Sequence, residues 1–169
     1  LEADVQRHLH HHAAVAGITT ATASMTELDY QVRLRSGTSV SIELKTKRQR
    51  YSAWWAAQTR GLIAADQLII IDELTIRRLI DAAPHAYLLI ADLTATTTRW
   101  YGYSIGDLIV AERIRVARPL TTPGIVKGKC LYSLADAPIA EDDLDAAIDG
   151  IDLLTRTVNA CWHHIAPWP

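Results

Sequence analysis

The fold is decided by LDYQVRLRSGTSVSIELKTKR, residues 28–48. Apolar and polar side chains alternate on both sides of the turn SGT, residues 36–38. This period of two, interrupted by a glycine-containing turn, predicts a β-hairpin with one apolar face and one polar face. Because burial of the apolar face fixes the strand register, the polar side chains of both strands must share the opposite face.

Three charged side chains, Asp29, Glu43 and Lys45, belong to this polar face. A three-residue loop would place Asp29 opposite Lys45, and a five-residue loop would place it opposite Glu43. Either register keeps the carboxylates close, because facing Cβ atoms lie about 5 Å apart and diagonal ones about 7–8 Å. Two carboxylates at that spacing can share one Mg²⁺ ion. The neighbouring lysine can orient a water molecule or stabilise charge on a phosphate.

The same charges have a plainer interpretation, a solvated sheet face with cross-strand ion pairs worth about 0.2–1 kcal/mol each. Two observations favour chemistry over this alternative. The flanking positions Gln31, Ser39 and Ser41 are neutral. The residues that follow Lys45 are basic, with Lys47, Arg48 and Arg50 in close succession. A formal net charge of −2 excludes a chain that is basic overall, so nucleic acid would have to bind such a local patch.

The remaining periodicity predicts alternating helices and buried strands over residues 1–169, without a linker or an internal repeat. We therefore expect a single domain of the α/β class, with a mixed central sheet flanked by helices. The expected elements are a helix over 2–16, a polar connector over 19–24, a helix over 51–65, a strand over 66–72, a helix over 73–83, a strand over 85–93, a strand or hairpin within 99–118, a strand over 128–134 and a helix over 140–164.

Asp29, thirteen further residues and then Glu43-Leu44-Lys45 resemble the motif of the PD-(D/E)XK nuclease superfamily, with Leu28 in place of the usual proline. The core of that family runs helix–strand–strand–strand–helix–strand, which is similar to the order expected over residues 2–93. The resemblance implies a restriction-endonuclease-like core and an Mg²⁺- or Mn²⁺-dependent hydrolysis of phosphodiester bonds in nucleic acid, with a DNA endonuclease as the expected form. It makes Asp29 and Glu43 metal ligands and catalytic residues together with Lys45.

The same resemblance implies further roles. Glu2, or Asp4 beside it, corresponds to an acidic ligand that family members often carry on the first helix. Gln58 corresponds to a glutamine that some branches place beside the metal site, although Leu62 stands where those branches have a tyrosine. Lys47, Arg48 and Arg50 are the expected contacts to nucleic acid. A homodimer or a larger complex is expected as well.

The alternative is a catalytically inactive protein that keeps the nuclease fold and binds nucleic acid or another protein. Cys130 and Cys161 do not make a disulfide framework, so we expect both to be reduced and buried in a cytoplasmic protein. No apolar run reaches the roughly 18 residues of a membrane span, and no membrane partner is expected. His8 and His12, four residues apart on the first expected helix, suggest zinc, but too few other ligands are recognisable.

Overall fold

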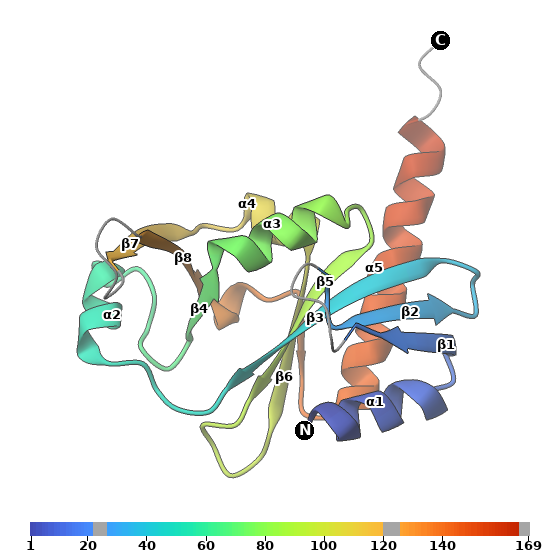
Figure 1. Cartoon of the computed structure of the whole chain (residues 1–169), viewed down its shortest axis with the longest axis horizontal. Helices are drawn as coiled ribbons and strands as arrows, with labels where there is room; N and C mark the ends of the chain where they lie inside the picture. Colours follow the sequence, from blue (N-terminus) through green and yellow to red (C-terminus); the bar gives the residue numbers. More distant parts are fainter. Residues whose placement is uncertain (22–26, 120–125, 166–169) are drawn as a thin grey trace.

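Two β-sheets and five α-helices form the described residues 1–21, 27–119 and 126–165 of the computed structural model (Figure 1). The six-stranded sheet has the order β1-β2-β3-β5-β6-β9, and the three-stranded sheet has the order β4-β8-β7. The strands are β1 (Val15–Thr20), β2 (Tyr30–Leu34), β3 (Ser39–Lys47), β4 (Leu68–Asp72), β5 (Ala86–Asp92), β6 (Arg99–Ser104), β7 (Ile114–Pro119), β8 (Val126–Ser133) and β9 (Ile139–Glu141). The helices are α1 (Glu2–His11), α2 (Ala53–Gln58), α3 (Glu73–Asp81), α4 (Ile105–Val110) and α5 (Leu144–Ile165), with a short 3₁₀ turn η1 (Leu134–Asp136).

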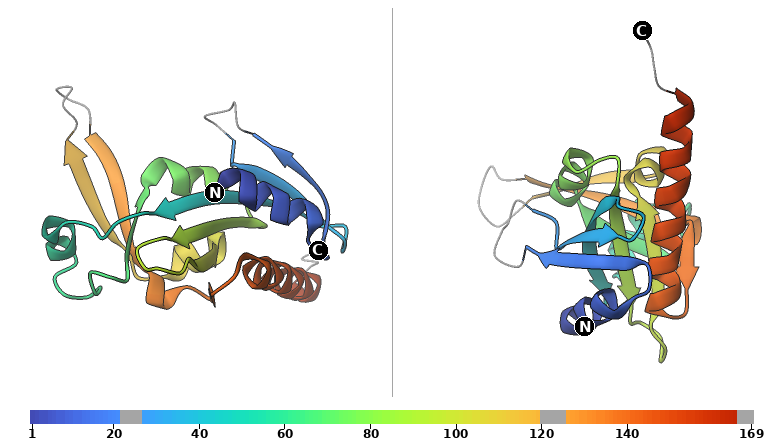
Figure 2. Two further views of the ribbon diagram at one scale, coloured as in Figure 1. Left: turned by 90° about the horizontal axis from the view of Figure 1, so that it is seen from below. Right: turned by 90° about the vertical axis from the view of Figure 1, so that its right-hand side faces the viewer.

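The large sheet is mixed, which confirms the coarse fold prediction. The pairs β1–β2 and β2–β3 are antiparallel, and the pair β3–β5 is parallel. The pairs β5–β6 and β6–β9 are antiparallel again. A parallel pair needs a long crossover, and here the crossover carries α2, β4 and α3. The small sheet and α2 lie at one end of the molecule, and α5 lies at the other (Figures 1 and 2).

Both faces of the large sheet are buried. On one face, Val5 and Leu9 of α1 and Ile148 and Ile151 of α5 pack in one apolar cluster with strands β2, β3 and β5. On the other face, α3, α4 and the small sheet share a second cluster with β5 and β6. Strand β5 is therefore buried at every residue. Glu43 lies under this second cover, whereas Gln31 and Arg33, on the same face of β2, are exposed.

The hairpin prediction is confirmed from Tyr30 onward. Tyr30 pairs with Ile42 and Arg33 pairs with Ser39, which is the register of the five-residue loop, so Asp29 lies opposite Glu43. The predicted alternation fails at one position. Leu28 packs in the second cluster, on the face opposite Tyr30, because β2 begins only at Tyr30 and the chain before it turns toward α3.

Three predicted helices are shorter than expected. The first ends at His11, and residues 15–20 form β1 instead, because pairing with β2 overrides a local helical pattern. The second ends at Gln58, since Arg60 and Gly61 adopt the positive φ angles 52° and 81° that end a helix. The last begins at Leu144, because residues 139–141 pair with β6 as β9.

Two further predictions concern the cysteines and membrane-spanning segments. Cys130 is buried as expected, whereas Cys161 is exposed, which corrects the prediction that both thiols lie in the core. Cys161 stands on α5, near the end of that helix, where it does not pack in the apolar clusters. No helix in the described ranges is both long enough and apolar enough to cross a bilayer.

Candidate functional site

Asp29 sits where β2 begins, and its carboxylate lies against the backbone of β3. Oδ2 accepts a hydrogen bond from the Leu44 N–H at 2.8 Å. That N–H faces the side of β3 on which β2 has ended, so the carboxylate satisfies a backbone donor that would otherwise lack a strand partner. This bond occupies Oδ2 and places Asp29 beside the residue that follows Glu43.

Glu43 is the most unusual side chain of the site, because it is only 1 % exposed. Its Oε1 accepts hydrogen bonds from Lys45 Nζ at 2.5 Å and from Arg78 Nη2 at 2.7 Å. Its Oε2 is buried, and no hydrogen-bond partner for it occurs in the described part of the chain. A buried carboxylate oxygen without a partner is costly and calls for an explanation. Solvated surface decoration is not that explanation.

Arg78 completes the site from α3 and was not anticipated from the sequence. Besides Glu43, its guanidinium donates to the Glu27 carbonyl at 2.9 Å and to Thr75 Oγ1 at 3.4 Å. Its side chain is 18 % exposed. One signal was available in the sequence: Arg78 lies between the apolar residues Ile76 and Leu79 of an amphipathic helix, and an arginine there needs an anionic partner.

The basic segment after Lys45 divides into a buried part and an exposed part. Lys47 has a side chain that is 0 % exposed, and its Nζ lies 3.2 Å from Asp92 Oδ2 and also contacts the Asp66 carbonyl. The ammonium is therefore enclosed by protein and does not face a nucleic acid. Arg48 and Arg50 are exposed, as a phosphate contact requires. Lys45 itself is 34 % exposed, between these two extremes.

Glu2 lies near the other face of the hairpin, at the start of α1. Its carbonyl accepts a hydrogen bond from the Tyr30 hydroxyl at 3.3 Å. Burial, followed by the negative charges of Glu2 and Asp29, raises the pKa of Tyr30 to about 12. Both carboxylates thus act on one buried hydroxyl, but the exposed Glu2 side chain is not grouped with Glu43. Its neighbour Asp4 pairs with Arg7 at 2.6 Å.

Gln58 lies apart from the carboxylates. Its amide donates to the Trp54 carbonyl within α2 at 3.3 Å. Gln58 also lines a hollow between the end of α2 and β7. Both elements lie at the end of the molecule occupied by the small sheet (Figure 1). The structure therefore brings together Asp29, Glu43 and Lys45, adds Arg78, and does not add Gln58.

A metal at this site would rest on two carboxylates. Among the side chains that the structure describes, no group of three or more His, Cys, Asp or Glu is placed to hold an ion. Mg²⁺, however, is commonly bound by one or two carboxylates, with water and phosphate oxygens as the other ligands. Glu43 Oε2, which has no hydrogen-bond partner among the described residues, and the Asp29 carboxylate fit that donor set.

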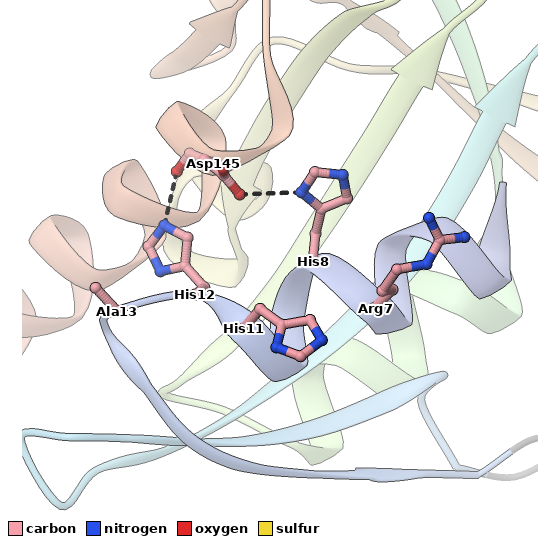
Figure 3. Close-up of a pocket in the computed structure, with 6 residues that line it drawn as sticks. All are labelled: Arg7, His8, His11, His12, Ala13 and Asp145. Carbon is pink, nitrogen blue, oxygen red and sulfur yellow. Dashed lines mark hydrogen bonds and ion pairs between the residues drawn. The ribbon is translucent and has the colours of Figure 1, made fainter.

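The histidines of α1 form a separate pocket of about 350 Å³. His8 Nδ1 lies 3.2 Å from Asp145 Oδ1, and His12 Nε2 lies 3.2 Å from the Asp145 carbonyl (Figure 3). Arg7, His11 and Ala13 complete the lining. These contacts tie α1 to the beginning of α5, and within the described residues they do not make a metal cluster.

Comparison with protein-family models, with curated proteins and with solved structures finds no match for this chain. The interpretation of the site therefore rests on its own geometry and on the order of the secondary structure elements. The side chains of the candidate site come from three places in the described structure, the start of β2, strand β3 and helix α3, and each can be substituted separately.

Proposed function

We propose that this protein is a divalent-metal-dependent phosphodiester hydrolase that acts on nucleic acid, as a DNA endonuclease of the PD-(D/E)XK type. The observation that carries the proposal is the buried Glu43 carboxylate, whose Oε2 has no hydrogen-bond partner among the described residues while Oε1 is held by Lys45 and Arg78. A bound cation would satisfy that oxygen. Asp29 precedes β2 and, by the register of the hairpin, lies opposite Glu43, which supports a shared ion.

The order of elements supports the same proposal. Leaving aside α2 and β4, the chain runs α1, β1, β2, β3, α3, β5, which is the helix–strand–strand–strand–helix–strand order of the resemblance. The three motif residues lie at the start of β2 and on β3, where that order would put them. The inserted α2 and β4 leave the large sheet and contribute to a second layer instead.

Each side chain has a role in this proposal. Asp29 and Glu43 would hold Mg²⁺ or Mn²⁺, which when bound supplies Lewis-acid polarisation of a phosphate oxygen. Lys45, held against Glu43 and partly exposed, would orient the attacking water and offset negative charge on the phosphate. Arg48 and Arg50 would contact the phosphate backbone.

The second candidate, a nuclease-like fold that only binds, is favoured by Arg78. The guanidinium contacts Glu43 Oε1 at 2.7 Å and so already supplies positive charge beside the carboxylate. A cation and this arginine would compete for the charge of Glu43 unless the arginine moves toward its other acceptors. If Arg78 is a permanent substitute for the metal, DNA binding should persist without cleavage under any cation.

The test is cleavage of supercoiled plasmid DNA by the purified protein with Mg²⁺ or Mn²⁺. We expect nicking that depends on added metal and that Glu43→Gln reduces by more than about 100-fold, since even the partners of metal ligands are worth about 10–100-fold. Glu141→Gln, the same change on β9, should leave the rate unaltered. Cleavage by Glu43→Gln at the wild-type rate, or no cleavage with either metal, would overturn the proposal.

A further inference from the structure

A hollow of about 650 Å³ lies between the end of α2 and strand β7. We call it the α2–β7 hollow. It contains three arginines from two separate segments, Arg60 after α2 and Arg113 and Arg115 at β7. The other residues that line it are Ala57, Gln58, Thr59, Leu62, Ile114, Val116 and Ala117. None of the three arginines belongs to the candidate site.

The near-zero net charge of the chain conceals a strong separation of charge along the sequence. Residues 48–61 include three arginines and no acidic residue, and residues 113–133 include five basic residues and no acidic one. Residues 130–155 include seven acidic residues and no basic one. The first two segments supply α2, β7 and β8, which lie at one end of the molecule, whereas the acidic segment leads into α5 at the other end (Figure 1). At that end Asp72 pairs with Lys127 and Lys129, and Glu73 pairs with Arg115. The attraction of a polyanion to the α2–β7 hollow therefore depends on Arg60 and Arg113.

Two of the three arginines are available to a ligand. Arg115 is clamped to Glu73, with Nη2 at 2.8 Å from each carboxylate oxygen. Arg60 and Arg113 are exposed, and neither has an ion pair with a carboxylate among the described residues. Arg113 has a hydrogen bond with the Tyr132 hydroxyl, which carries no charge that would neutralise the guanidinium. Arginine presents a planar fork of N–H donors that matches a phosphate, so two exposed arginines without a carboxylate partner among the described residues suit a phosphodiester backbone.

The turn that presents Arg60 is built rigidly. Thr59 is fully buried, and its Oγ1 donates to the Ala56 carbonyl at 2.7 Å. Arg60 follows at φ 52°, in the left-handed region that a side chain other than glycine rarely adopts. The backbone position of this arginine is thus fixed by its buried neighbour, and a glycine would fit the same φ without strain.

A basic path connects the hollow with the candidate site. Strand β3 carries Glu43 and Lys45, and the connection from β3 to α2 carries the exposed Arg48 and Arg50 (Figure 1). Helix α2 also exposes Trp54, whose side chain is 52 % accessible. Cationic side chains therefore follow the chain from the proposed hydrolytic residues to the hollow.

We infer that the α2–β7 hollow holds the phosphate backbone of duplex DNA, outside the nucleotides that would be cut. The choice of DNA as the occupant rests on the proposed function, while the charge of the hollow does not. The contacts are to phosphates, so binding should be independent of sequence and sensitive to salt.

The test measures binding of a short fluorescent DNA duplex by anisotropy in EDTA over a series of salt concentrations. The variant is Arg60→Gly with Arg113→Gln, which leaves the turn unstrained. The control is Arg33→Gln with Arg156→Gln, which removes the same charge from β2 and α5. We expect the hollow variant to bind about tenfold more weakly and its salt slope to fall by roughly 2, while the control stays within about twofold of wild type.

Unchanged affinity in the hollow variant, or equal losses in both double variants, would overturn the inference. Binding of a polyglutamate peptide can also be compared. If wild type binds this peptide more tightly than the duplex, and the hollow variant does not bind it, the ligand of the hollow is an acidic protein and not DNA. The outcome for the proposed function can be distinguished from the outcome for this inference. If plasmid DNA stays uncut but the hollow variant binds DNA more weakly than wild type, DNA binding at the hollow is supported and only the hydrolase activity is rejected.

Discussion

At the scale of single residues, the contact between Glu43 and Arg78 makes the sharpest prediction about stability. Arg78→Met leaves a 1 % exposed carboxylate with Lys45 as its one remaining cation. Removing one partner of a buried ion pair costs about 3–5 kcal/mol, and the remaining lysine favours the lower end. Urea unfolding should show a loss of about 3 kcal/mol, part of which Mn²⁺ restores if the ion takes over the charge of the guanidinium.

The neighbouring Arg77 supplies the control for that experiment. Its side chain is 67 % exposed and pairs with Glu73 on the surface of α3. Arg77→Met should cost less than about 1 kcal/mol, because exposed ion pairs contribute little. If Mn²⁺ stabilises Arg78→Met no more than it stabilises Arg77→Met, the metal does not reach Glu43.

The sequence could predict part of this site and not the rest, for a physical reason. Asp29, Glu43 and Lys45 were predicted to be neighbours because parity along two adjacent strands is a local property. Lys47 has the same parity, yet its ammonium is buried, because Asp92 and Asp66 come from other parts of the fold. Long-range partners of this kind carry no periodic signal in the sequence.

At the scale of secondary structure elements, the pairing of β4 with β8 is reinforced by charge. Asp72 ends β4, faces Lys129 in the ladder and pairs with Lys127 as well. Burial alone would raise the pKa of Asp72, but hydrogen bonds and charge from Lys129 and Lys127 outweigh it and lower the pKa below 3.8. A carboxyl with a lowered folded pKa stabilises the protein above its unfolded pKa, and that contribution disappears as the pH falls through the folded value.

Asp72→Asn should therefore reduce the difference in stability between neutral and strongly acidic solution. Wild type and variant should differ most at neutral pH and converge once the pH falls below the lowered folded pKa of Asp72, where Asp72 is protonated in both folded and unfolded protein. Thermal unfolding across that pH range measures the effect. Asp81→Asn, at an exposed position on α3, is the matched control. A difference that stays constant across the range would show that the carboxylate charge of Asp72 does not contribute.

Elements were predicted well where one pattern acted alone and poorly where two competed. Strands β4 and β5 are continuous apolar runs, and both were predicted within two residues of their bounds. Residues 13–16 fit an apolar helical stripe equally well, but Val15 pairs with Leu34 instead. Pairing with β2 at the edge of the sheet determines the structure of this segment. A helical pattern in the sequence gives no information about which edge of a sheet is available for pairing.

At the scale of the whole molecule, the two-sheet arrangement could not be predicted, because β4 and the consecutive strands β7 and β8 are far apart in the sequence. The layers of the large sheet meet α5 at Ile139, which is 3 % exposed. A Cβ added to Gly102 on β6 would lie 2.9 Å from Ile139 Cδ1, and one added to Gly150 on α5 would lie 3.0 Å from Cγ1. Strand and helix therefore approach one another across a single side chain, with glycine on both sides.

A double-mutant cycle tests that packing. Ile139→Ala should cost about 2–5 kcal/mol through the cavity it opens. Gly150→Ala alone gains about 1 kcal/mol of helix propensity but presses a methyl group against Ile139, so its net effect should be small. In the Ile139→Ala background the pressure is gone, and Gly150→Ala should stabilise by about 1 kcal/mol. Urea unfolding of the four proteins gives the coupling free energy, and strictly additive effects would mean that α5 is not held to the sheet through Ile139.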